Sequence, residues 1–275
     1  MIQPVLKETP FILDVVAACA DKPQRLHLWW LGQSGFLIAW DGRTAPIDLY
    51  LSDSLTEKYA GTDKPHVRMS QRVVRPELLA HANLQVVFAT HQHTDHLDPQ
   101  TLTPMFRACP CATLVVPRPL RELAAKRAGM RRLMGVSDGS TGHLGGFTFE
   151  AVPAAHPTIE TDDRGDLTCV GYIITAGPRR IYHCGDTVVF GGMAERLRPL
   201  SVDVAILPIN GKIGNMSGRD AARLAKQIGA KLVIPCHYDM FEFNTADPTE
   251  QFEPECQAIA QPYRVLRLGE RLTLG

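Results

Sequence analysis

Three histidines and an aspartate lie within one run of six residues, which reads His91-Gln92-His93-Thr94-Asp95-His96. Neutral imidazole nitrogens and carboxylate oxygens are the ligand atoms that bind Zn, Fe or Mn in proteins. Residues two apart point the same way at the end of a strand, so His91 and His93 can bind one metal ion. Asp95 and His96 lie one step into the following turn and can bind a second ion beside it. The run therefore predicts a metal centre.

Three more residues of ligand type each follow an apolar segment that is typical of a strand. His156 follows residues 147–153, Asp186 follows residues 181–185, and His237 follows residues 232–236. Taken singly, each is compatible with an ordinary polar residue. The carboxyl ends of strands in α/β folds meet at one edge, where ligands bind. The recurrence of one such residue after each strand therefore predicts that all three converge on the six-residue run.

Two ligand sets follow from this convergence. The first is His91, His93 and His156, and the second is Asp95, His96 and His237. Asp186 is expected to bridge the two ions, because a carboxylate has two oxygens and an imidazole cannot span two metals. Zn, Mn and Fe all accept nitrogen and oxygen ligands, so the ligand types leave the metal open. Two divalent metal ions are the expected cofactors.

The surrounding segments predict two mixed sheets with helices outside them, in one domain over residues 1–275. Strands are predicted at residues 27–30, 35–40, about 46–51, 84–90, 113–117, 147–153, 170–175, 180–183, 202–207, 231–235, 263–268 and 271–274. Helices are predicted from residue 76 and at residues 99–109, 118–130, 220–228 and 247–260. Strands come in runs as well as alternating with helices, which disfavours a simple doubly wound sheet. Residues 52–75 are polar and aperiodic, and so long a loop in a compact domain is often functional.

The composition argues against several classes of protein. The formal net charge of the 275 residues is zero, so no broad surface for nucleic acid or membrane is expected. No segment approaches the length of a transmembrane helix, and Asp14 interrupts the apolar stretch 11–20, which disfavours a signal peptide. The seven cysteines are odd in number and form no CxxC pair, which favours reduced thiols in a cytoplasmic protein. A homo-oligomer is also compatible with this composition.

Taken in order, the ligand motifs resemble the metallo-β-lactamase superfamily. The elements that carry the resemblance are His91-x-His93-x-Asp95-His96, His156, Gly185-Asp186-Thr187 and His237. Four motifs in one order over so much of the chain are specific. The resemblance implies an α/β fold of mixed sheets, the four-layer αβ/βα sandwich, with the metal ions at one edge between the sheets.

A closer resemblance, to the L-ascorbate-6-phosphate lactonases, extends over most of the chain. It is carried by Trp29-Trp30-Leu31-Gly32, residues 89–98, Asp162-Asp163-Arg164, Tyr182-His183-Cys184-Gly185-Asp186, residues 231–239 and Ala246-Asp247-Pro248. This resemblance implies a cytoplasmic, divalent-metal-dependent hydrolase of a small-molecule sugar-acid lactone, such as a phosphorylated one. The chain is shorter than these lactonases and has His156 where they carry a carboxylate. The resemblance therefore identifies a subfamily better than a substrate.

The expected reaction is hydrolysis by hydroxide. Two divalent ions lower the pKa of a shared water toward neutrality, and the resulting hydroxide attacks the ring carbonyl of a lactone. Asp186 would bridge the ions, and either Asp95 or a metal-bound water would supply the proton to the leaving alkoxide. Candidate substrate-binding residues are Arg164, Lys212, Asn215, Tyr238 and Asp239. Two alternatives stay open: a metal-dependent phosphodiesterase of phospholipase D type, and a metal-binding protein without catalytic activity.

Overall fold

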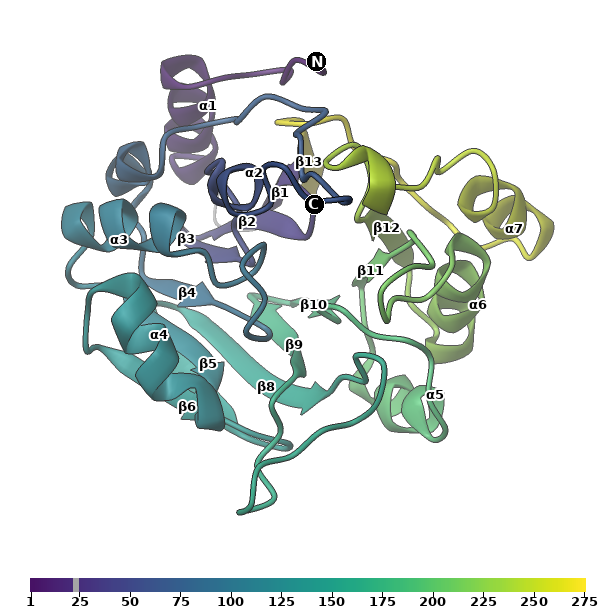
Figure 1. The fold of residues 1–275 in the computed structure, drawn as a ribbon. Coiled ribbons are helices and arrows are strands. Elements are labelled where there is room, and N and C mark those ends of the chain that lie inside the picture. Colours follow the sequence, from purple (N-terminus) through teal and green to yellow (C-terminus); the bar gives the residue numbers. More distant parts are fainter. Residues whose placement is uncertain (22–24) are drawn as a thin grey trace.

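The computed structural model describes residues 1–21 and 25–275. Its two β-sheets face each other, and helices cover their outer faces (Figure 1). Aromatic rings of the two sheets meet in the core, where the ring of Phe88 lies 5.2 Å from that of Phe149 and 5.0 Å from that of Tyr172. One apolar cluster contains residues of both sheets. Burial of the two facing apolar surfaces therefore holds the layers together.

The first sheet has seven strands in the order β13-β1-β2-β3-β4-β5-β6. Their bounds are β1 Leu26–Gly32, β2 Gly35–Trp40, β3 Arg43–Ile47, β4 Val86–Phe88, β5 Thr113–Pro117, β6 Leu133–Val136 and β13 Arg271–Leu274. The pairs β13–β1, β1–β2 and β2–β3 are antiparallel, whereas the pairs β3–β4, β4–β5 and β5–β6 are parallel. The parallel half brings the carboxyl ends of β3 and β4 to the same edge of the sheet.

The second sheet has six strands in the order β12-β11-β10-β9-β8-β7. Their bounds are β7 Thr141–Leu144, β8 Phe147–Pro153, β9 Val170–Ala176, β10 Arg179–His183, β11 Val204–Pro208 and β12 Leu232–Cys236. Strand β9 is antiparallel to both β8 and β10, and β10, β11 and β12 are parallel. Strands β8, β10, β11 and β12 thus run in one direction, and their carboxyl ends share one edge.

Helices α1, α3 and α4 lie outside the first sheet, and α5, α6 and α7 lie outside the second (Figure 1). The α-helices are α1 Thr9–Cys19, α2 Ser54–Lys58, α3 Pro99–Ala108, α4 Arg121–Ala128, α5 Met193–Leu197, α6 Gly218–Ile228 and α7 Phe252–Ala258. Four 3-10 helices are Pro76–Ala82, Arg118–Leu120, Arg198–Leu200 and Glu242–Asn244. Helix α6 begins where the Ser217 side chain accepts from the Asp220 amide, and it ends at left-handed Gly229. None of the described helices is long and apolar enough to cross a membrane.

Near the C-terminus, one prediction is wrong and another is confirmed only in part. Residues 263–268 form no strand and make only one bridge, between Val233 and Tyr263. The helix predicted at 247–260 is confined to α7, with Pro254 in its first turn, where a missing backbone N–H costs little. The strand predicted at 46–51 also ends early, because the chain turns at Asp48, whose φ is 49°. Helices α1, α2 and α5 and strands β6 and β7 were not predicted.

Candidate metal centre

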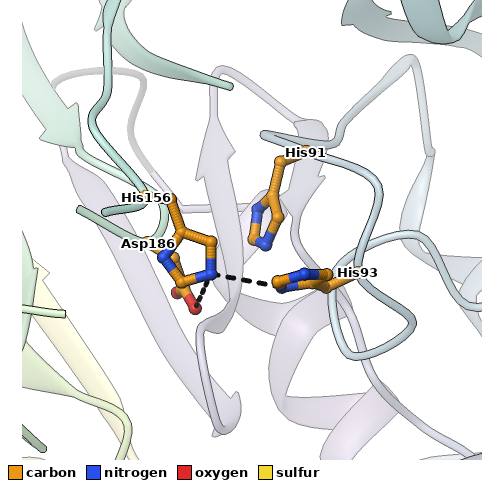
Figure 2. Close-up of side chains that lie close together, drawn as sticks. All are labelled: His91, His93, His156 and Asp186. Atoms are coloured by element: carbon orange, nitrogen blue, oxygen red, sulfur yellow. Dashed lines mark hydrogen bonds and ion pairs between the residues drawn. The ribbon is translucent and has the colours of Figure 1, made fainter. Parts of the chain in front are cut away.

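The structure brings the first predicted ligand set together. His91 and His93 follow β4, His156 follows β8, and Asp186 follows β10. Their ligand atoms lie within 4.8 Å of one another, and the four side chains converge (Figure 2). His156 Nε2 lies 3.2 Å from His93 Nδ1 and 3.8 Å from Asp186 Oδ2. Ligand atoms that each lie about 2.0–2.2 Å from one ion are separated from one another by distances similar to those measured here. These four side chains can therefore bind one metal.

The second set, Asp95, His96 and His237, is also assembled, with ligand atoms within 4.8 Å of one another. His96 Nε2 lies 3.7 Å from Asp95 Oδ2. His237 follows β12 with a φ of 63°, and its ring stacks with that of His96 at a centroid distance of 5.6 Å. The two sets contain all seven residues that the sequence indicated as metal ligands.

Asp186 lies between the two sets. Its Oδ1 is 2.6 Å from His237 Nε2 and 3.2 Å from His96 Nε2, whereas its Oδ2 faces His156. Each carboxylate oxygen therefore faces a different ligand set. This orientation is the one that a carboxylate bridging two ions requires.

Four buried polar atoms at the centre of the two sets have no hydrogen-bond partner outside the candidate ligands among the described residues. They are His91 Nε2, which faces no partner, and His96 Nε2, His237 Nε2 and Asp186 Oδ1, which face only one another. An unsatisfied buried polar atom costs about 1–3 kcal/mol, and native proteins contain few of them. Four in one place, all metal-ligand atoms, fit a site for divalent cations.

A buried carboxylate outside the ligand sets fixes the tautomers of two histidines. His96 Nδ1 donates to Asp48 Oδ2 at 2.8 Å. The Thr90 hydroxyl also donates to Asp48 Oδ2, at 2.7 Å, so its own oxygen accepts from His91 Nδ1, which lies 3.1 Å away. In their neutral form both rings therefore carry a hydrogen on Nδ1 and present the lone pair of Nε2 to the centre. The sequence analysis did not identify Asp48.

Other contacts hold the remaining ligands. His156 Nδ1 donates to the carbonyl of Gly214 at 3.0 Å, which leaves Nε2 free to bind a metal. Gln33 lies in the turn between β1 and β2, and its amide nitrogen donates to Asp95 Oδ2 at 2.9 Å and lies 3.1 Å from His237 Nδ1. Its carbonyl accepts the backbone N–H of His237 at 3.1 Å. Gln33 therefore connects both sheets to the second ligand set, although the sequence marked it only as a turn residue.

Electrostatics distinguish the two sets before any metal binds. Burial and the neighbouring His96 hold the pKa of His91 well below its usual value, and burial also lowers the pKa of His93. Burial alone would lower the pKa of His96, but the carboxylates of Asp186, Asp48 and Asp95 together raise it well above its usual value. At pH 7 His91 and His93 are thus neutral and ready to bind, whereas His96 carries a proton that a metal must displace.

Metal binding to the second set is therefore expected to release about one proton from His96 at pH 7. The affinity of this set should fall as the pH is lowered, because the raised pKa of His96 makes the proton a stronger competitor. Titration calorimetry in two buffers of different ionisation enthalpy measures the proton count. A binding heat that is the same in both buffers would contradict the expectation.

A cavity of about 500 Å³ opens onto the centre. His93, Asp95, His156 and Asp186 lie at its base, and residues of the predicted functional loop 52–75 form part of its wall. The other lining residues include the cationic Lys58, Lys64 and Arg127, the acidic Asp63, and the aromatic or apolar Leu55, Tyr59, His66, Phe241, Phe243 and Ile213. Arg127 is fixed there by donating to the carbonyls of Gln92 and Leu97.

None of the five candidate substrate residues is among the described residues that line this cavity. Arg164 is exposed in a turn where its amide donates to Asp162 at 2.9 Å. Buried Tyr238 stacks on Trp30 at 4.1 Å, and Asp239 faces a different hollow.

Two of those five residues instead position loops around the centre. Asn215 Oδ1 accepts the amide of Thr187 at 3.0 Å, and the Thr187 hydroxyl accepts the amide of Ala155 at 2.9 Å. Thr187 follows Asp186 and Ala155 precedes His156, so Asn215 helps to hold both ligand-bearing turns. Lys212 Nζ donates to the carbonyls of Phe243 and Thr245, at 3.2 Å each.

Neighbours of the ligands on β10 and β12 are buried and lie outside both ligand sets. His183 Nε2 donates to the carbonyl of Ser34 at 2.8 Å, and its Nδ1 accepts the amide of Gly185 at 3.2 Å. It therefore supports the turn that presents Asp186. Burial raises the pKa of the Cys184 and Cys236 thiols well above the usual value, which keeps both protonated.

Comparisons with known proteins agree with this geometry. The family model described as "Beta-lactamase superfamily domain" matches residues 60–238. A UPF0173 metal-dependent hydrolase of Caldivirga maquilingensis is 28% identical over 250 residues, covering 90% of this chain and 98% of the relative. One from Alkaliphilus metalliredigens is 29% identical over 238 residues, covering 84% and 92%. The structure of Igni18, a metallo hydrolase from Ignicoccus hospitalis, is similar at a TM-score of 0.67 and 26% identity, covering 92% of this chain and 99% of that one.

Proposed function

The chain belongs to the metallo-β-lactamase superfamily and is one of its metal-dependent hydrolases, and we propose that it hydrolyses a lactone or another carboxylic ester at a centre of two divalent metal ions. Family membership confirms the predicted fold class and the resemblance to the superfamily. One observation carries the proposal of two metals: two assembled ligand sets share Asp186, whose oxygens face different sets. No comparison supports the narrower L-ascorbate-6-phosphate specificity, so we propose the lactone class rather than that compound.

Different residues would have different roles in such a reaction. Bound divalent ions would supply Lewis acidity and a hydroxide at neutral pH. His91, His93 and His156 would hold one ion, and Asp95, His96 and His237 the other, with Asp186 between them.

Asp95 is suited to move the proton. Burial and the neighbouring Asp186 would raise its pKa, but His96, His237 and the hydrogen bond from Gln33 lower it below the usual value, so the carboxylate is ionised at neutral pH. Asp95 would therefore accept the proton of the attacking water and then pass it to the leaving alkoxide. Gln33 holds this carboxylate in place through Oδ2.

The cationic wall of the cavity favours a substrate or product with an acidic group. Lys58, Lys64 and Arg127 all line it, and hydrolysis of a lactone or ester produces a carboxylate that such charges attract. We further propose a small-molecule substrate and a cytoplasmic location; the latter is supported by seven thiols that are unpaired in the described structure.

Metal content and turnover, measured on the same preparation, test this function. We expect about two ions per chain after reconstitution with Zn or Mn, together with hydrolysis of members of a panel of lactones and esters. Turnover of bis(p-nitrophenyl) phosphate alone would move the function to the phosphodiesterase alternative and leave the site intact. Tight metal binding without any turnover would favour the non-catalytic alternative, and failure to bind metal would refute the proposed centre.

A further inference from the structure

An exposed isoleucine stands at the mouth of the metal cavity in a backbone conformation that is unfavourable for it. Ile213 lies in the loop after β11, lines the cavity and is 58% exposed. Its φ is 49°, in the left-handed region. A β-branched residue is a genuine outlier there, and such strain is concentrated at functional sites.

The strain at Ile213 is not offset by burial of its own side chain against the described residues. Glycine adopts the left-handed region without a steric penalty, and the neighbouring Gly211 and Gly214 occupy it with φ of 61° and 78°. An isoleucine between them would be compensated by burial of its side chain, but that side chain is mostly exposed. A ligand in the cavity would supply the missing apolar contact.

Aromatic side chains from two other segments line the same cavity. The rings of Tyr59 and His66 stack at a centroid distance of 4.2 Å, and the ring of Phe243 meets His66 edge-on at 4.5 Å. All three are half-buried and line the cavity together with Ile213. We call these four residues the apolar lip.

Polar contacts tie the parts of the apolar lip together. Lys212, next to Ile213, donates to the carbonyls of Phe243 and Thr245. Asn210 Nδ2 donates to Asn244 Oδ1 at 2.7 Å. The loop that carries Ile213 is therefore fixed to the segment that carries Phe243, and the lip forms one surface beside the metal ligands.

We propose that the apolar lip binds the non-reacting apolar part of the substrate, an alkyl chain or aryl ring attached to the group that reacts at the metal centre. The identity of that reacting group rests on the proposed function, whereas the lip itself does not. Alkyl-substituted lactones or esters are then better substrates than hydrophilic sugar lactones. Ile213 is the residue that sets this preference.

Binding of two hydroxamates to the metal-loaded full chain tests the lip without turnover. Acetohydroxamate and octanohydroxamate share the metal-binding group and differ only in the alkyl chain. We expect octanohydroxamate to bind at least about tenfold more tightly, since apolar pockets discriminate by that much for small additions. Ile213→Gly should remove most of this difference without weakening acetohydroxamate binding or lowering the melting temperature, because glycine relieves the backbone strain. Ile213→Leu should retain it.

Ile159→Gly is the matched control, since Ile159 is also exposed, at 47%, but is not among the cavity-lining residues. It should keep the wild-type ratio of affinities. Three results would each refute the proposal for the apolar lip. They are equal affinities of the wild type for the two hydroxamates, no binding of either hydroxamate, and an Ile213→Gly variant in which binding of both is weakened equally.

The same preparations, given γ-butyrolactone and γ-decalactone, separate the two hypotheses. If neither lactone is hydrolysed while the hydroxamates show the chain-length effect, the proposed function fails and the lip stands. If both lactones are hydrolysed with the same kcat/KM and the hydroxamates bind equally, the lip fails and the proposed function stands.

Discussion

Asp186→Asn is expected to lower kcat/KM on any substrate of this protein by about 10³-fold or more, and to reduce metal content from about two ions per chain toward one. The side chain keeps its shape, but the amide nitrogen cannot bind a metal. Because Oδ1 faces His96 and His237 while Oδ2 faces His156, the change removes a ligand from one set whichever way the amide turns. Elemental analysis of the purified variant, together with turnover on the ester panel, measures both effects.

Asp138→Asn is the control for Asp186→Asn, because it makes the same chemical change at an exposed surface pair with Arg196. Surface pairs contribute little to stability, so this variant should match the wild type in metal content and rate. Near-normal turnover of Asp186→Asn with about two ions still bound per chain would show that the ligand assignment is wrong. A normal rate with one metal lost would show that a single ion suffices for the reaction.

The convergence of the candidate metal ligands could be predicted because each follows a local signal. A continuous apolar segment indicates a buried strand, and a histidine or aspartate directly after it, as at Asp186 and His237, is placed at the sheet edge by the parallel direction of the strands. The sequence thus indicated both sheets and the convergence of the ligands. Register and strand order were not required for that inference.

The supporting residues were not predicted, because their positions depend on left-handed turns. Asp48 falls within the predicted strand 46–51, but its φ of 49° ends β3 after Ile47 and turns the carboxylate toward His96. Gln33, with a φ of 51°, looks in sequence like a turn residue between two strands. In hindsight, Asp48 carries the same signal as Asp186, a carboxylate directly after an apolar strand.

The residues that line the cavity could not all be predicted from local sequence patterns, for a different reason. Loop 52–75 was predicted to be functional from its length, and its residues do line the cavity. Its partners, Phe243 and Ile213, come from segments that follow other strands, so only the packed chain shows that they meet. The candidate Lys212 was one residue away from the exposed side chain that lines the cavity, and its own ammonium group instead ties two loops together.

Asp48→Asn is expected to weaken metal binding about 10- to 100-fold although Asp48 is in neither ligand set. In the wild type, Oδ1 accepts the amide of Thr90 at 2.8 Å, and Oδ2 accepts from the Thr90 hydroxyl and from His96 Nδ1. If the asparagine oxygen stays on the Thr90 amide, its NH2 group faces His96 Nδ1 as a donor. The hydrogen of His96 must then move to Nε2, the atom that should bind the metal.

The same substitution also reaches the first ligand set. Once the asparagine NH2 donates to the Thr90 hydroxyl oxygen, the hydroxyl hydrogen is free to turn toward His91 Nδ1, which favours the tautomer with the hydrogen on Nε2. The opposite amide orientation places NH2 against the Thr90 amide and leaves two buried donors facing each other, which costs stability. Titration of the metal-free variant with Zn measures the loss of affinity, and the proton released from His96 should decrease because one of the carboxylates that raise its pKa is gone.

Asp203→Asn is the control: Asp203 is also a buried carboxylate that accepts a backbone amide, from Arg180, but it has no contact with a histidine. Asp203→Asn should lower stability without changing metal affinity. An equal loss of metal affinity in Asp48→Asn and Asp203→Asn would refute the tautomer argument.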